Sequence, residues 1–164
     1  MNRFAAAAAL CLVATPSFSQ MITITPTQIG EIFCISRTGN DMAPVEGLLT
    51  VELKAAIAEA EAKNDAIQKA HPDEKPPLGD GIPWQAFPDY AAECKVGKVT
   101  LEADQATVDI AYSFPEYPDA NFTDHLQLRL VSFPMVSEPL WRIDDLTYAT
   151  EGDLRTVLVS VFEN

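Results

Sequence analysis

Two adjacent carboxylates, Asp144 and Asp145, are the first candidates for chemistry in this chain. They follow Ile143 in a predicted strand, where strict alternation would bury Asp145 and expose Leu146. A one-residue bulge at the pair would return Leu146 to the buried face, and bulges often turn side chains toward a site. The pair is therefore a candidate for acid–base chemistry. The alternative is structural: one carboxylate caps a neighbouring turn while the other faces solvent or Arg142.

The histidines and cysteines do not have the spacing of a metal or redox centre. Neither His71 nor His125 stands in an HExxH or HxH arrangement, so the sequence predicts no metal site and no cofactor. Beyond residue 20 the cysteines are Cys34 and Cys94, and an even pair in an oxidising compartment favours a disulfide. The chain has no CxxC, GxSxG, P-loop or Rossmann glycine pattern.

Residues 71–90 form a Pro- and Gly-rich segment that excludes regular secondary structure. Long loops in compact domains are often functional, and this one carries Asp80, Trp84, Phe87 and Asp89. Large apolar side chains on such a loop are of the kind that anchors an interface. The two acids favour a cationic or polar-tipped ligand over an anion. The alternative is that Trp84 and Phe87 only pin the loop to the core.

Residues 1–20 have the pattern of a signal peptide. Arg3 supplies a positive n-region, Ala5 to Ala14 form a short apolar core, and Ser17-Phe18-Ser19 places small residues for cleavage before Gln20. The apolar run is too short to span a bilayer. We therefore expect an exported protein, periplasmic or secreted, with a single domain over residues 21–164 and no membrane span.

The charge balance limits the class of partner. The formal net charge is −13 at pH 7. A surface this acidic repels phosphate backbones and anionic membranes, so we expect no nucleic-acid partner.

Hydrophobic periodicity places these candidates on an α+β scaffold. Helical spacing predicts a helix over Thr25–Arg37, a short turn or helix over Pro44–Leu49, and a long helix capped by Thr50 and running to Ala70. Alternation predicts about four antiparallel strands: Val96–Ala103, Gln105–Phe114, His125–Phe133 and one that begins at Trp141. Expected inward side chains include Val99, Leu101, Val108, Ile110, Tyr112, Leu126, Leu128, Leu130, Trp141 and Ile143.

The segment from Thr150 to Phe162 is predicted to form a C-terminal amphipathic helix. Thr150, with Asp153 three residues on, resembles a capping box. The apolar positions that follow recur at helical spacing and predict a stripe facing the core: Leu154, Val157, Leu158, Val161 and Phe162.

Helices first, then an antiparallel meander and a terminal helix resemble the nuclear-transport-factor-2-like fold of the cystatin-like group. The segments LLTVELKAAI, GDGIPWQAFPDY, LWRIDDLTY and GDLRTVL resemble a function-unassigned family of exported bacterial proteins with that fold. The resemblance implies a cone in which the sheet curls around the long helix, with its open end as the binding region. It implies no particular activity, because a fold alone does not fix function.

On this scaffold the preferred function is a non-enzymatic binding protein. We expect a small ligand or a protein partner, such as a toxin blocked by an immunity-type inhibitor, at a cone mouth lined by Trp84, Tyr112 and Trp141. The alternative is a small cavity-based isomerase, lyase or hydrolase. Isomerase-like members of the resembling fold use an Asp base with a Tyr donor, but Asp109 falls on the strand face opposite Tyr112.

Overall fold

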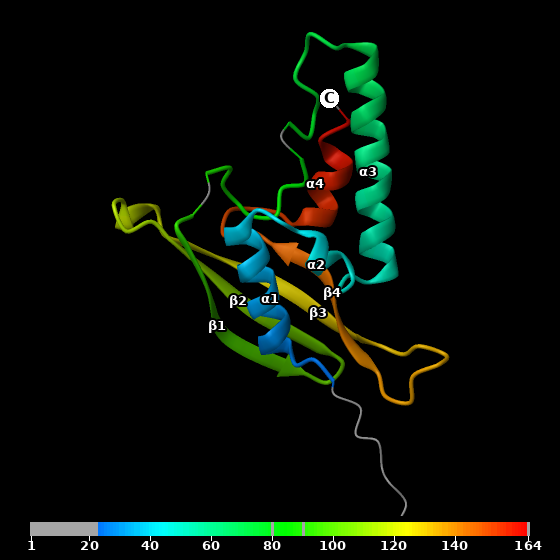
Figure 1. Cartoon of the computed structure of the whole chain (residues 1–164), viewed down its shortest axis with the longest axis vertical. Coiled ribbons are helices and arrows are strands. Elements are labelled where there is room, and N and C mark those ends of the chain that lie inside the picture. Colours follow the sequence, from blue (N-terminus) through cyan, green and yellow to red (C-terminus); the bar gives the residue numbers. More distant parts are fainter. Residues whose placement is uncertain (1–22, 80, 90, 164) are drawn as a thin grey trace, which may run out of the picture.

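The computed structural model describes residues 23–79, 81–89 and 91–163 (Figure 1). The elements follow in the order α1 (Pro26–Gly39), α2 (Ala43–Glu46), α3 (Val51–Ala70), β1 (Glu93–Glu102), β2 (Gln105–Ser113), the 3-10 turn η1 (Pro118–Ala120), β3 (Phe122–Val131), β4 (Leu140–Thr147) and α4 (Leu154–Ser160). The strands pair antiparallel in the order β1-β2-β3-β4, which confirms the α+β class. Within these ranges no helix has both the length and the apolar character that crossing a membrane requires. The expected signal peptide, residues 1–20, lies outside the described residues.

The first helix begins at the predicted Thr25-Pro26, and the third begins at its predicted cap, Thr50. The Thr25 hydroxyl accepts a bond from the Gln28 N–H, and the Gln28 side chain accepts one from the Thr25 N–H, a complete capping box. Thr50 caps α3 through its bond with the Leu53 N–H, at 3.2 Å. Asn40 ends α1 in the left-handed conformation, with φ of 52°.

The helix that covers the sheet is α1, which packs across β1 and β2 (Figure 1). Ile29 and Phe33 are fully buried there. Gly30 permits a close approach, since a Cβ at this position would lie 2.9 Å from side-chain atoms of both Val96 and Val108.

The long helix α3 lies beside β4 and packs on α4 (Figure 1). The chain just before it pairs in parallel with β4: the Ile143 N–H bonds the Leu48 carbonyl, and the Thr50 N–H bonds the Ile143 carbonyl, both at 2.8 Å. This pairing fixes the start of α3 at the outer edge of β4. The expectation of a sheet curled around the long helix therefore differs from the observed packing, where α1 takes the sheet face.

A bulge lies at the predicted position in β4. Gln127 pairs with Asp145 while Leu128 pairs with Ile143, so Asp144 is the extra residue. Ile143 and Leu146 are consequently both fully buried.

A second bulge, in β1, is absent from the sequence prediction. Val96 pairs with Ile110 and Val99 with Val108, which inserts one residue at Gly97-Lys98. The predicted inward position of Leu101 is wrong: its side chain is 63% exposed, because it lies at the hairpin end of an edge strand.

The predicted disulfide is present and ties α1 to β1. The Cα atoms of Cys34 and Cys94 are 5.1 Å apart, and the bridge closes a sequence separation of 60 residues.

The closing helix is shorter than predicted, and its cap is Asp153 rather than Thr150. The Asp153 carboxylate accepts the Thr156 N–H at 2.8 Å. Gly152, with φ of 92°, takes a conformation that directs the chain into this cap. Leu154 and Leu158 form the buried part of the predicted stripe.

Candidate functional site

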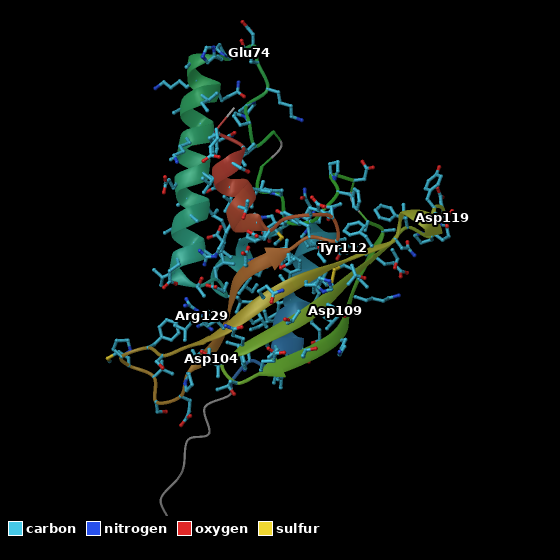
Figure 2. All side chains as sticks on the ribbon, turned by 180° about the vertical axis from the view of Figure 1, so that it is seen from behind. Glu74, Asp104, Asp109, Tyr112, Asp119 and Arg129 are labelled. Carbon is cyan, nitrogen blue, oxygen red and sulfur yellow. A yellow bond between two sulfur atoms is a disulfide. The ribbon has the colours of Figure 1, made fainter. Side chains whose placement is uncertain are left out.

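An open cleft of about 820 Å³ lies between the β2–β3 connection and the end of the Pro-rich loop. Its lining combines aromatic rings, two carboxylates and small or amide side chains: Phe87, Phe114, Tyr117, Phe122, Asp89, Asp119, Ala120, Asn121 and Ala149. The volume falls in the range of small-molecule sites, roughly 300–1,000 Å³. Figure 2 labels Asp119 at the far end of this connection, with Tyr112 on the strand that leads to it. We call this feature the aromatic cleft.

Phe122, the first residue of β3, is the central ring of the aromatic cleft. Phe87 meets it edge-on with ring centroids 4.9 Å apart, and Tyr112 stacks behind it at 4.6 Å. Phe114 is tilted against it, with ring centroids 6.2 Å apart. The aromatic wall therefore joins the Pro-rich loop to both central strands of the sheet.

The β2–β3 connection is braced from within. The Asn121 side-chain oxygen accepts the Phe114 N–H at 2.8 Å, and the turn Pro118–Ala120 lies between these two residues in the chain. Tyr117 projects from this turn with 70% of its side chain exposed.

The other wall is held by a buried polar group that we call the loop clamp: Arg37, Gln85, Tyr112, Asp124 and Tyr148. The Arg37 guanidinium donates to Gln85 at 2.6 Å, and the Gln85 amide donates to the carbonyls of Phe87 and Asp89, each at 2.6 Å. The hydroxyls of Tyr112 and Tyr148 donate to the carbonyls of Trp84 and Pro83. These side chains come from α1, β2, β3 and the end of β4, so the whole domain positions the loop.

Asp124 is the acidic member of the loop clamp, and its side chain is fully buried. Its two oxygens accept the Ala86 N–H at 2.9 Å and the Ala149 N–H at 2.8 Å. Burial raises the pKa of this carboxyl, and the two N–H donors partly oppose that rise. Burial also raises the pKa values of Tyr112 and Tyr148, with the nearby Asp124 carboxylate adding to the effect.

The six residues that the sequence proposes for binding lie in different surroundings. Phe87 and Asp89 line the aromatic cleft. Tyr112 is 2% exposed and supports Phe122 from behind, while Trp84 is 9% exposed and packs edge-on against Phe33. Asp80 lies outside the described residues.

Trp141 is not brought together with the others. It pairs with Leu130, whereas Tyr112 pairs with Phe122, eight positions earlier on β3. At about 3.3 Å per residue this separation along the strand is roughly 26 Å. Figure 2 labels Arg129, the neighbour of Leu130 on β3, well apart from Tyr112 along the sheet.

Sequence reasoning missed Phe114, Tyr117, Asp119 and Phe122. A signal was available: the tetrapeptide Phe-Pro-acid-Tyr occurs at residues 87–90 and again at 114–117. Proline disfavours the helical region for the residue before it, so the Phe of each copy is expected to have extended backbone. The Phe of each copy, Phe87 or Phe114, lines the aromatic cleft.

The carboxylate pair at the β4 bulge has structural partners. Asp144 accepts the Thr50 hydroxyl and an Arg155 N–H, both at 2.9 Å, and lies 3.4 Å from Arg129. Asp145 accepts the N–H groups of Leu146 and Arg155. The pair joins the start of α3 to the start of α4, and the arginines that face it are Arg155 and Arg129 rather than Arg142.

The outer sheet face carries a second polar cluster. Asp109 and His125 are 2.8 Å apart on this face, opposite the buried Tyr112. This agrees with the expectation that Asp109 and Tyr112 do not form one site. Among the described residues no group of His, Cys, Asp and Glu is arranged to hold a metal ion.

Comparisons with family models, with curated proteins and with solved structures gave no match.

Proposed function

We propose that this protein is a non-enzymatic binding protein that holds a small ligand in the aromatic cleft. The observation that carries the proposal is the cleft itself: about 820 Å³, with four aromatic side chains among its lining residues. Exposed aromatic groups are costly in water and are the usual anchors of a binding site. Phe87 is 43% exposed and Tyr117 is 70% exposed, so both are accessible to a ligand.

The buried acid and phenols beneath the cleft support a holding role over a catalytic one. Both oxygens of Asp124 accept backbone N–H groups, and the hydroxyls of Tyr112 and Tyr148 donate to backbone carbonyls. A general base must reach a substrate proton within hydrogen-bond distance. These groups are instead engaged with the loop and fix the cleft wall.

We also propose that the protein works outside the cytoplasm, because a disulfide such as Cys34–Cys94 persists in oxidising compartments. The proposed kinship with the nuclear-transport-factor-2-like cone is supported by the order of helices, meander and terminal helix. Its binding end would then correspond to the aromatic cleft. A cone of this kind would have α1, rather than α3, on the sheet face.

The test is amide NMR of the oxidised protein titrated with a mixture of small neutral, cationic and anionic aromatic and alkyl compounds. The proposal expects shift changes concentrated at Phe87, at residues 114–122 and at Ala149. It also expects Phe87→Ser to weaken those changes. Leu101→Ser is the matched control, since it removes another exposed apolar side chain at the hairpin end of β1. Shift changes that avoid the cleft, or equal effects of the two substitutions, would contradict the proposed site.

A further inference from the structure

The residues that line the aromatic cleft differ from an ordinary apolar pocket in their charge. Asp89 and Asp119 are both exposed and both line it. None of the described lining residues is Lys, Arg or His. The side-chain amide oxygen of Asn121 is already engaged with the Phe114 N–H. The charged groups offered to a ligand here are therefore carboxylates.

The aromatic rings also attract cations, as the carboxylates do. The face of an aromatic ring carries negative potential, so a cation within about 6 Å of its centroid is attracted, most strongly when it is weakly hydrated. Phe122 meets Phe87 edge-on and has Phe114 at 6.2 Å, while Tyr117 extends from the turn beside them. A ligand in the cleft thus contacts rings from two separate segments of the chain.

We propose that the ligand class of the aromatic cleft is a small organic cation of the quaternary ammonium type; this inference rests on the proposed function. Methylated ammonium groups have no N–H to satisfy, are weakly hydrated and fit against ring faces. The carboxylates at the rim contribute attraction at longer range, which the formal net charge of −13 reinforces. A free cation fits this rim better than a phosphocholine headgroup, because the headgroup phosphate would lie close to the same carboxylates.

The experiment compares three probes of nearly equal shape by amide NMR. They are choline, the neutral alcohol in which a tert-butyl group replaces the trimethylammonium group, and the tert-butylacetate anion. The inference expects choline to bind at least several-fold more tightly than the alcohol, and the anion to bind least, with shifts at the cleft residues. It also expects choline affinity to fall as salt is added, because exposed charges are screened.

Tyr117 provides the decisive variants, since its exposed position makes damage to the fold small. Tyr117→Leu keeps apolar area but removes the ring, and we expect choline to bind about three- to tenfold more weakly while the neutral alcohol is little affected. Tyr117→Phe keeps the ring and should retain choline binding. Asp119→Asn should give a smaller, salt-dependent loss.

The outcomes separate this inference from the proposed function. If the alcohol and the anion bind at the cleft as tightly as choline does, the proposed binding site is supported and the cation inference is overturned. If the protein binds phosphatidylcholine vesicles or a lysine-rich peptide but not choline, a lipid or protein partner replaces the small cation. If no probe shifts the cleft residues, both proposals are overturned.

Discussion

Asp124 shows how one side chain connects the fold to the site. It is buried below the cleft and holds Ala86 and Ala149 in place, and Ala149 lines the cleft wall. Asp124 directly precedes the predicted strand His125–Phe133, and alternation with Leu126 places it on the buried face, an unusual position for a carboxylate. It is explained by the backbone N–H groups that must be satisfied where the loop crosses the sheet.

We predict a pH-dependent cost for Asp124→Asn. The amide oxygen of the variant can accept only one of the two N–H groups. The free energy of unfolding of the variant should therefore be about 1–3 kcal/mol lower than that of the wild type. Burial raises the pKa of the folded carboxyl above its unfolded value. The stability that Asp124 contributes is therefore largest at low pH and decreases as pH rises through the folded-state pKa. The groups near this carboxyl are Arg37, His125, Tyr112 and Tyr148.

Urea unfolding of both proteins between about pH 4 and pH 8 measures the difference. The difference in unfolding free energy between wild type and Asp124→Asn should become smaller as the pH increases. Asp119→Asn, an exposed aspartate on the β2–β3 connection, serves as the control and should change stability little at any pH. A difference that becomes larger with pH would mean that the two N–H donors lower the pKa of Asp124 more than burial raises it.

At the scale of single elements, local sequence rules succeed where the controlling contacts are local. The capping box of α1, the Thr50 cap of α3 and the bulge that separates Ile143 from Leu146 follow from neighbouring residues. The observed cap of α4 is Asp153 rather than the predicted Thr150. The reason is that Gly152 takes a positive φ and Asp153 pairs with Thr147 at the end of β4. That bridge is a tertiary contact, which spacing along the helix does not reveal.

We predict that α4 stabilises the domain through one face only. Leu158 is 3% exposed, so Leu158→Ala should cost about 2–5 kcal/mol in unfolding free energy. Asp153→Ala removes the cap and should cost on the order of 1 kcal/mol. Val159 is 55% exposed on the same helix, and Val159→Ala should therefore have an effect below about 0.5 kcal/mol. Chemical denaturation would contradict the packing if Leu158→Ala and Val159→Ala proved equal.

At the scale of the whole molecule, the sequence predicts the α+β class, the order of elements and the disulfide. It does not predict the candidate site, because the aromatic cleft forms from two segments that only the completed sheet brings together. Phe87 and Asp89 are recognisable from the loop composition, while Phe114 and Phe122 depend on how the β2–β3 connection folds toward that loop. Trp141 is proposed for binding because tryptophan often anchors interfaces, but its position in β4 places it at the other end of the sheet.

The disulfide links the helical layer to the sheet, and its removal should affect the entire domain. Cys34→Ala with Cys94→Ala frees a loop of 60 residues in the unfolded chain. The chain-entropy model gives a loss of roughly 4 kcal/mol as an upper value. Denaturant unfolding of the oxidised protein and the double variant at the same pH measures this loss. Equal midpoints for the two proteins would show that the bridge adds nothing to stability.

The loop clamp also bears on how the protein folds. Four of its bonds join residues 28, 38, 48 and 65 positions apart, so a long loop must close before each of these four can form. We therefore expect residues 83–89 to dock late, after α1, β2, β3 and the end of β4 have assembled. A chain in which this loop has not docked would lack one wall of the cleft, so the proposed ligand would bind only the completely folded protein. By mass action a ligand then stabilises only the finished molecule, by about 2.7 kcal/mol at a hundredfold excess over its dissociation constant.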